Sequence, residues 1–270
     1  MDSGQGDNHE KSWPDLHADI ARADDTDIDS LWDRFEIFEA FHHEMTIDNP
    51  MTSADVDEVV EMLSPSNGDH ALDIACGHGE LLRRIRRAAA VSTTGVDLSP
   101  WMLRAAHELA QQESLDISWE LAEGKDYAND RIFDLATCLG GSWIWHGFGG
   151  TVRALAQRAN PSGRIAIGDM HLRDGLDAAA VTESHGAVES IDELESHFDA
   201  HGLDIVGRVN TSDEAWDDYL ARTRSSVESW ARLHPGERSN SYLADQQRWQ
   251  DDHARDREIL TWSVWVAKKR

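Results

Sequence analysis

Strand-like and helix-like patterns alternate along most of this 270-residue chain, starting at residue 70. The strand-like stretches are short and apolar, and they occupy residues 70–75, 92–98, 117–122, 132–139, 164–169, 203–209 and 260–267. Segments with the apolar spacing of helices lie between them, at residues 80–90, 100–112, 151–159 and 190–201. Repeated β-α-β order predicts an α/β fold with a doubly wound, mainly parallel sheet and helices on both of its faces.

Two regions outside this alternation are expected to form a helical lid over the sheet. Residues 29–64 carry amphipathic patterns, and residues 212–257 contain about two more helices, broken at His234-Pro-Gly236. A cover of this kind excludes water from a ligand at the sheet edge. Residues 1–28 are rich in Asp and have no apolar period, so we predict an acidic disordered tail followed by one folded domain, residues 29–270.

The charge of the chain bears on its partners and its solvent. Lys and Arg number 25 against 51 Asp and Glu, which gives a formal net charge of −26. Such a surface repels phosphate, so we expect no nucleic acid and no membrane as a partner. An acidic, lysine-poor composition suits molar salt, where the Debye length is about 3 Å, and we hypothesise a halophilic protein. Two cysteines and no apolar run of about 18 residues predict a cytoplasmic location.

The segment Ala71-Leu-Asp-Ile-Ala-Cys-Gly-His-Gly-Glu80 combines a buried strand, a turn of small residues and the start of a helix. Gly77 and Gly79 let a ligand approach the backbone, and the helix N-terminus offers N–H groups to it. A second acid, Asp97, ends the next strand twenty residues after Gly77. A carboxylate at that place can accept both hydroxyls of a ribose, so the pattern predicts a nucleoside cofactor.

Two nucleoside cofactors fit this arrangement. A dinucleotide site has the pattern G-x-G-x-x-G/A, but Leu82 stands at its last position and is too bulky for close helix–strand packing. An acid inside the first strand, Asp73, can instead face the ammonium group of an aminoacyl sulfonium. The spacing from Asp73 through Ala75 and Gly77 to Gly79 therefore favours S-adenosylmethionine over a nicotinamide cofactor.

The same segment resembles the first motif of the class I S-adenosylmethionine-dependent methyltransferases, with Ala75 where the family usually has Gly. Further segments resemble later strands of the family in the family's order, at residues 95–100, 133–138 and 160–168. The flanks resemble a small-molecule-type branch, through residues 138–143, 214–219 and 258–262. The resemblance implies a seven-stranded Rossmann-like fold and methyl transfer to a small-molecule acceptor by in-line displacement.

Roles for individual residues follow from the resemblance. It implies Asp73 near the methionine ammonium, Asp97 on the ribose diol, and Leu98 with Met102 near adenine. The family usually has Gly-Asp after the third strand, where this chain has Gly124-Lys-Asp126, so the adenine contact falls to Asp126 or is lost. The expected cofactor-binding residues are Asp73, Ala75, Cys76, Gly77, His78, Gly79, Asp97, Leu98, Met102, Asp126, Cys138 and Leu139.

Residues that follow the fourth and fifth strands are the candidates for contact with the acceptor. Trp143 and Trp145 could wall an apolar or cationic acceptor, or pack against the lid helices instead. His146 is the candidate general base, with a solvated side chain as the alternative, and His171 is a second candidate. We expect no metal at His42-His-Glu44, because adjacent residues on one helix point apart.

The same residues bear on alternative functions. Amino-directed nucleic-acid methyltransferases carry Asn/Asp-Pro-Pro-aromatic after the fourth strand, where this chain has Leu139-Gly-Gly-Ser, and the Pro-Cys nucleophile of cytosine-carbon enzymes is absent. The alternative from a different class is a non-catalytic sensor of S-adenosylmethionine or S-adenosylhomocysteine. Such a sensor would have a pocket closed to a second substrate. The acceptor atom, whether N, O, S or C, stays open at this point.

Overall fold

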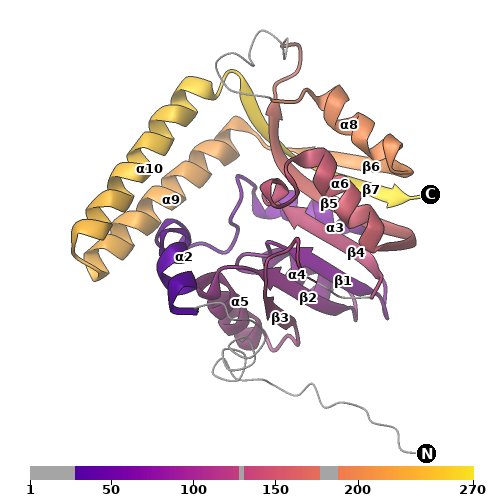
Figure 1. Ribbon diagram of the computed structural model, residues 1–270, viewed down its shortest axis with the longest axis horizontal. Coiled ribbons are helices and arrows are strands. Elements are labelled where there is room, and N and C mark those ends of the chain that lie inside the picture. The colour runs from indigo at the N-terminus through magenta and orange to yellow at the C-terminus, as the bar shows by residue number, and fades with distance from the viewer. Residues whose placement is uncertain (1–27, 128–130, 177–187) are drawn as a thin grey trace, which may run out of the picture.

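The computed structural model describes residues 28–127, 131–176 and 188–270 (Figure 1). The predicted acidic tail, apart from Ile28, lies outside these described residues. None of the described helices combines the length and the apolar character that a membrane crossing requires.

A seven-stranded sheet forms the centre of the described fold, in the order β3-β2-β1-β4-β5-β7-β6. The strands are β1 (His70–Ile74), β2 (Ser92–Asp97), β3 (Ser118–Leu121), β4 (Phe133–Leu139), β5 (Ala159–Leu172), β6 (Leu203–Asn210) and β7 (Leu260–Lys269). All neighbouring pairs from β3 to β5 are parallel, whereas β7 runs antiparallel to both β5 and β6. The predicted mainly parallel, doubly wound sheet is confirmed.

Helices cover both faces of the sheet because its strands are apolar on both faces. In β1, for example, Ala71 belongs to one buried cluster, while Leu72 and Ile74 belong to the other. The first cluster is completed by α3 (Ser53–Leu63), α4 (Glu80–Ala88) and α5 (Pro100–Gln112). The second is completed by α6 (Phe148–Arg158) and α8 (Ile191–Ala200). Asp73 shares the face of Ala71, so its carboxyl group lies among buried side chains at the end of the strand.

A helical cap, formed by α2 (Ile28–His42), α9 (Asp213–Leu233) and α10 (Glu237–Asp256), stands over one edge of the sheet (Figure 1). Helices α9 and α10 separate at the predicted break, residues 234–236. Helix α2 lies between this pair and α5, and Trp101 Nε1 on α5 donates to the Trp32 carbonyl at 2.8 Å.

Helix α3 does not belong to this cap, although the sequence grouped residues 29–64 together as a lid. Its buried side chains Val56, Val59, Val60 and Leu63 all lie on one face and pack into the first cluster. An apolar stripe on α3 therefore joins the layer that covers the sheet. Within residues 29–64, the cover over the sheet edge comes from α2 and the segment that follows it.

Candidate functional site

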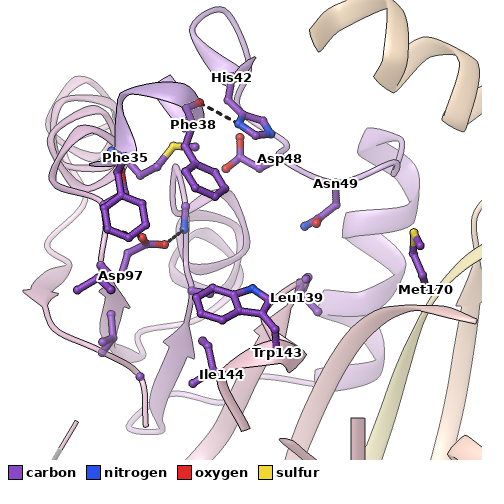
Figure 2. Close-up of a pocket in the computed structure, with 18 of the residues that line it drawn as sticks. Phe35, Phe38, His42, Asp48, Asn49, Asp97, Leu139, Trp143, Ile144 and Met170 are labelled. Carbon is purple, nitrogen blue, oxygen red and sulfur yellow. Dashed lines mark hydrogen bonds between the residues drawn. The ribbon is translucent and has the colours of Figure 1, made fainter. Parts of the chain in front are cut away.

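A cavity of about 510 Å³ lies between the carboxyl ends of the central strands and the helical cap (Figure 2). Its wall on the sheet side includes Ala75 after β1, Asp97 at the end of β2 and Leu139 at the end of β4. This is the crevice where a doubly wound sheet binds its ligands, since the strand order reverses between β1 and β4.

Asp97 marks one end of this cavity. Its Oδ2 accepts from the Gly77 N–H at 2.9 Å (Figure 2), and its Oδ1 accepts from the Ser99 N–H at 2.8 Å. Each carboxylate oxygen keeps a second lone pair, so the group can accept two further bonds from a diol in the cavity. Leu98 and Met102 line the same end. Burial raises the pKa of Asp97 above its ordinary value, although the two backbone N–H bonds oppose the rise.

The turn after β1 adopts left-handed backbone conformations at Ala75 (φ 57°), Gly77 (φ 51°) and Gly79 (φ 68°). A Cβ at Gly77 would lie 2.3 Å from Asp48 Oδ2, and one at Gly79 would lie 2.3 Å from the Trp119 ring. The glycines are thus required by protein neighbours that press on the turn, in addition to the ligand approach that the sequence suggested. Ala75 adopts the same conformation with a Cβ, at a cost of roughly 1–2 kcal/mol.

Asp73 lies beside a smaller adjoining cavity of about 60 Å³, which Cys76 and Leu139 also line. Its Oδ1 accepts from Thr137 Oγ1 on β4 at 2.7 Å. Burial raises the pKa of Asp73 to about 7; the Thr137 bond opposes this and the charge of Asp97 adds to it. A cation near this carboxyl group would stabilise its ionised form.

Cys76 and Cys138 are both free and buried, and burial raises the pKa of each thiol. Both are therefore neutral thiols near pH 7. Cys138 lies within the second buried cluster and does not line the large cavity.

His78 forms a buried ion pair with Asp48, a contact that the sequence did not reveal. Asp48 Oδ1 accepts from His78 Nδ1 at 2.7 Å, and Oδ2 accepts from the His78 backbone N–H at 2.9 Å. Burial favours the neutral form of both groups, but their mutual charge and hydrogen bonds outweigh it. The pKa of His78 is raised and that of Asp48 is lowered. The segment between α2 and α3 is therefore tied directly to the turn after β1.

The loop after β3 lines the cavity with residues other than Asp126, which the sequence had led us to expect there. Glu123, Gly124 and Lys125 line it, and the Lys125 ammonium pairs with Glu123 at 2.7 Å. The side chain of Asp126 is 72% exposed and is not part of the cavity wall. At this place the cavity wall is therefore formed by Glu123, Gly124 and Lys125, and Asp126 lies outside it.

Two of the four residues expected on the acceptor side line the cavity, and two do not. Trp143, which is 64% exposed, and His146 lie at its mouth. Trp145 instead packs against the second buried cluster, with the Arg158 guanidinium 5.7 Å from its ring centre. His171 is fully buried, and its Nε2 lies 2.8 Å from Ser263 Oγ. Because successive side chains of a strand face opposite ways, Met170 reaches the cavity and His171 does not.

The helical cap supplies cavity residues that sequence reasoning did not assign to the site. They come from α2, α9 and α10, and they are Phe35, Phe38, His42, Trp216, Tyr219 and Trp249. The helical spacing of Trp216 and Tyr219 indicates a buried face, but the spacing alone does not distinguish contact with the protein core from contact with the cavity. Only the position of the cap over the sheet turns that face toward a ligand. Among the described residues, no group of three or more His, Cys, Asp or Glu side chains could hold a metal ion.

Comparisons with protein families and with individual proteins identify methyltransferases among the relatives of this chain. Residues 71–163 match the family described as a methyltransferase domain. The 27-O-demethylrifamycin SV methyltransferase of Amycolatopsis mediterranei is 30% identical over 197 residues, which cover 66% of this chain and 69% of that protein. The uncharacterized protein YjhP of Escherichia coli is 29% identical over 208 residues, or 74% of this chain and 83% of that protein.

Solved structures that resemble this chain also include methyltransferases. A SAM-dependent methyltransferase from Geobacter sulfurreducens, in complex with S-adenosyl-L-homocysteine, superposes with a TM-score of 0.78 at 26% identity. The superposition covers 87% of this chain and 98% of the other.

Proposed function

Because this chain belongs to the class I S-adenosylmethionine-dependent methyltransferases, we propose that it methylates a small-molecule acceptor by in-line displacement at the large cavity. The cofactor, when bound, supplies a methyl group on a sulfonium centre. The remaining task of the protein is to bind and align two molecules and to exclude water.

The residues around the turn after β1 suit this cofactor. Asp97 lines the cavity, and the remaining lone pairs of its two oxygens would accept the ribose hydroxyls. Asp73 has the raised pKa of a carboxyl group without a compensating charge, and the methionine ammonium would supply that charge. Leu98 and Met102 would contact adenine, and Lys125 lies at the same end.

The shape of the cavity supports a second substrate. From Asp97 it continues past the end of β4 to a mouth where Trp143 is 64% and Met170 46% exposed. Exposed apolar side chains at the mouth of a cavity are typical of a binding site for an organic molecule. A non-catalytic sensor would instead require a pocket closed beyond the cofactor. The Amycolatopsis relative is named for a rifamycin SV derivative, which also favours a small organic acceptor.

Calorimetry of S-adenosylmethionine binding tests the role of Asp97, the observation on which the proposal most depends. The Asp97→Ala variant should bind at least tenfold more weakly, because a hydrogen bond to a charged group contributes about 1.5–3 kcal/mol. Asp116→Ala is the matched control, since Asp116 is exposed in the loop before β3. Equal affinity of the Asp97→Ala variant and the wild type would contradict the assignment.

Acceptor identity is accessible with methyl-labelled cofactor and a metabolite extract, followed by mass analysis of labelled products. We expect a labelled small molecule with the wild-type protein and far less with the Asp97→Ala variant. Retained cofactor binding with no labelled product would favour the sensor.

A further inference from the structure

His42, the last residue of α2, has a defined tautomer at the wall of the cavity. Its Nδ1 lies 3.0 Å from the Phe38 carbonyl oxygen (Figure 2). A carbonyl only accepts, so Nδ1 carries the proton and Nε2 presents a lone pair. The Nε2 atom lies 3.3 Å from the Tyr219 hydroxyl on α9, which can therefore donate to it. Both rings line the cavity although His42 is only 9% and Tyr219 7% exposed.

The charges around His42 suit a base that works near neutral pH. Burial lowers the pKa of His42; Asp48 opposes this, while His78 and Arg222 add to it, so the ring is neutral at pH 7. The Asp48 carboxyl group lies next to the imidazole (Figure 2) and would stabilise the imidazolium after proton uptake. Burial also raises the pKa of Tyr219, so its hydroxyl stays protonated and can pass on a proton.

The walls around this pair are aromatic. Phe38 from α2, Trp143 from the loop after β4 and Trp249 from α10 line the same cavity. The Trp249 ring lies 5.5 Å from that of Tyr219, edge to face. Flat apolar walls with few polar groups bind flat apolar molecules. The polar groups here include the Tyr219 hydroxyl, which lies within hydrogen-bond distance of the neutral His42 imidazole.

We propose that His42 is the general base of the methyl transfer and that the acceptor is an aromatic molecule with a hydroxyl group. The acceptor O–H bond breaks as its proton passes to the Tyr219 oxygen, and Tyr219 gives its own proton to His42 Nε2. The bonding electron pair stays on the acceptor oxygen, which becomes the nucleophile. This inference rests on the proposed methyltransferase function and adds the substrate class and the base to it.

Two probes separate a base from a structural residue: 2-naphthol, which is protonated at pH 8, and 4-nitrophenol, which is largely ionised there. For His42→Gln we expect a loss of at least about a hundredfold in the rate with 2-naphthol, because general bases contribute 10²–10⁴-fold. The loss with 4-nitrophenol should be below about tenfold. Tyr219→Phe should show the same selectivity. His43→Gln, at the neighbouring residue whose ring bonds Glu39, should change neither rate.

Binding and titration provide readouts besides activity. The protein saturated with S-adenosylhomocysteine should bind 2-naphthol in calorimetry, and His42→Gln should bind it within about threefold of the wild type. The imidazole of His42, assigned in NMR spectra by its loss in His42→Gln, should titrate below 6.5. Asp48, His78, Arg222 and Tyr219 face this ring and must remain intact in the experiment.

Several results would overturn the inference. Equal losses with both probes would make His42 a structural residue, and a hydroxyl-specific loss in His146→Gln instead would move the base to that side chain. Binding of S-adenosylhomocysteine without binding or methylation of 2-naphthol would refute the substrate class and leave the proposed function standing. Failure of the wild-type protein to bind S-adenosylhomocysteine would count against the proposed function itself.

Discussion

Replacing Asp48 by Asn removes the carboxylate that ties the segment after α2 to the turn after β1. In the wild-type protein this carboxylate accepts both the ring and the backbone N–H of His78, at 2.7 and 2.9 Å. The His78 side chain is 4% and the Asp48 side chain 18% exposed, so water replaces little of what is lost. The variant leaves a buried imidazole without its counter-charge.

Breaking a buried ion pair by removing one partner costs about 3–5 kcal/mol of unfolding free energy. We expect about 3 kcal/mol for Asp48→Asn, because part of Asp48 still reaches the cavity. His78→Gln should cost a similar amount. The double variant should cost about as much as either single change, which corresponds to a coupling energy of about 3 kcal/mol.

The difference in unfolding free energy between the wild type and the double variant depends on pH, and the pKa shifts of His78 and Asp48 determine how. The pKa of His78 is raised above 6.5, so its contribution is complete below pH 6.5 and is lost as the pH rises through the raised value. The pKa of Asp48 is lowered from 3.8, so its contribution is complete above pH 3.8 and is lost as the pH falls. The unfolding free energy of the wild type should exceed that of the double variant by the largest amount between these two pKa values.

Urea unfolding, monitored by tryptophan fluorescence at several pH values, measures all four proteins of this cycle. Asp57→Asn is the control, because its carboxylate is 62% exposed where it pairs with Arg84, and it should change stability by no more than about 1 kcal/mol. A coupling energy near zero, or a difference that grows steadily above pH 7, would refute the reasoning.

Three further predictions concern the cofactor turn and the solvent. Affinity for S-adenosylhomocysteine should rise roughly tenfold from pH 6 to pH 7.5 as Asp73 ionises, and calorimetry of Asp73→Asn should show no such rise. Gly77→Ala should weaken that binding more than tenfold, since its Cβ would displace Asp48, whereas Gly68→Ala, also at positive φ but in open space, should leave binding unchanged. The unfolding free energy should increase with KCl toward molar concentrations, and a value independent of KCl would contradict the halophilic hypothesis.

Much of the fold could be predicted from the sequence because its signals are local. Apolar period, turn residues and the order of elements are encoded within a few neighbouring positions, as in the turn at residues 75–79. The same holds for Asp97, which the next strand delivers to the sheet edge by parallel pairing with β1. These local patterns predicted the cavity wall at the ends of β1 and β2, where Ala75, Gly77 and Asp97 lie.

The side of the cavity that faces the helical cap depends on contacts between distant parts of the chain, which no local pattern encodes. His42 and Tyr219 are 177 residues apart, and Asp48 and His78 are 30 residues apart. Side-chain direction also follows packing, so Trp145 turned into the core although it was expected at the cavity.

By itself, the sequence determined the α/β class, the strand positions and the cofactor motif, because hydrophobic period and turn chemistry act over short stretches of chain. Only the tertiary structure decided which side chains complete the site. The cap helices α2, α9 and α10 are amphipathic. Because either the protein core or a ligand can cover an apolar helix face, the sequence pattern does not tell which of the two does so. Their docking over the ends of β1 and β4 is what turned His42, Asp48 and Tyr219 toward the cavity.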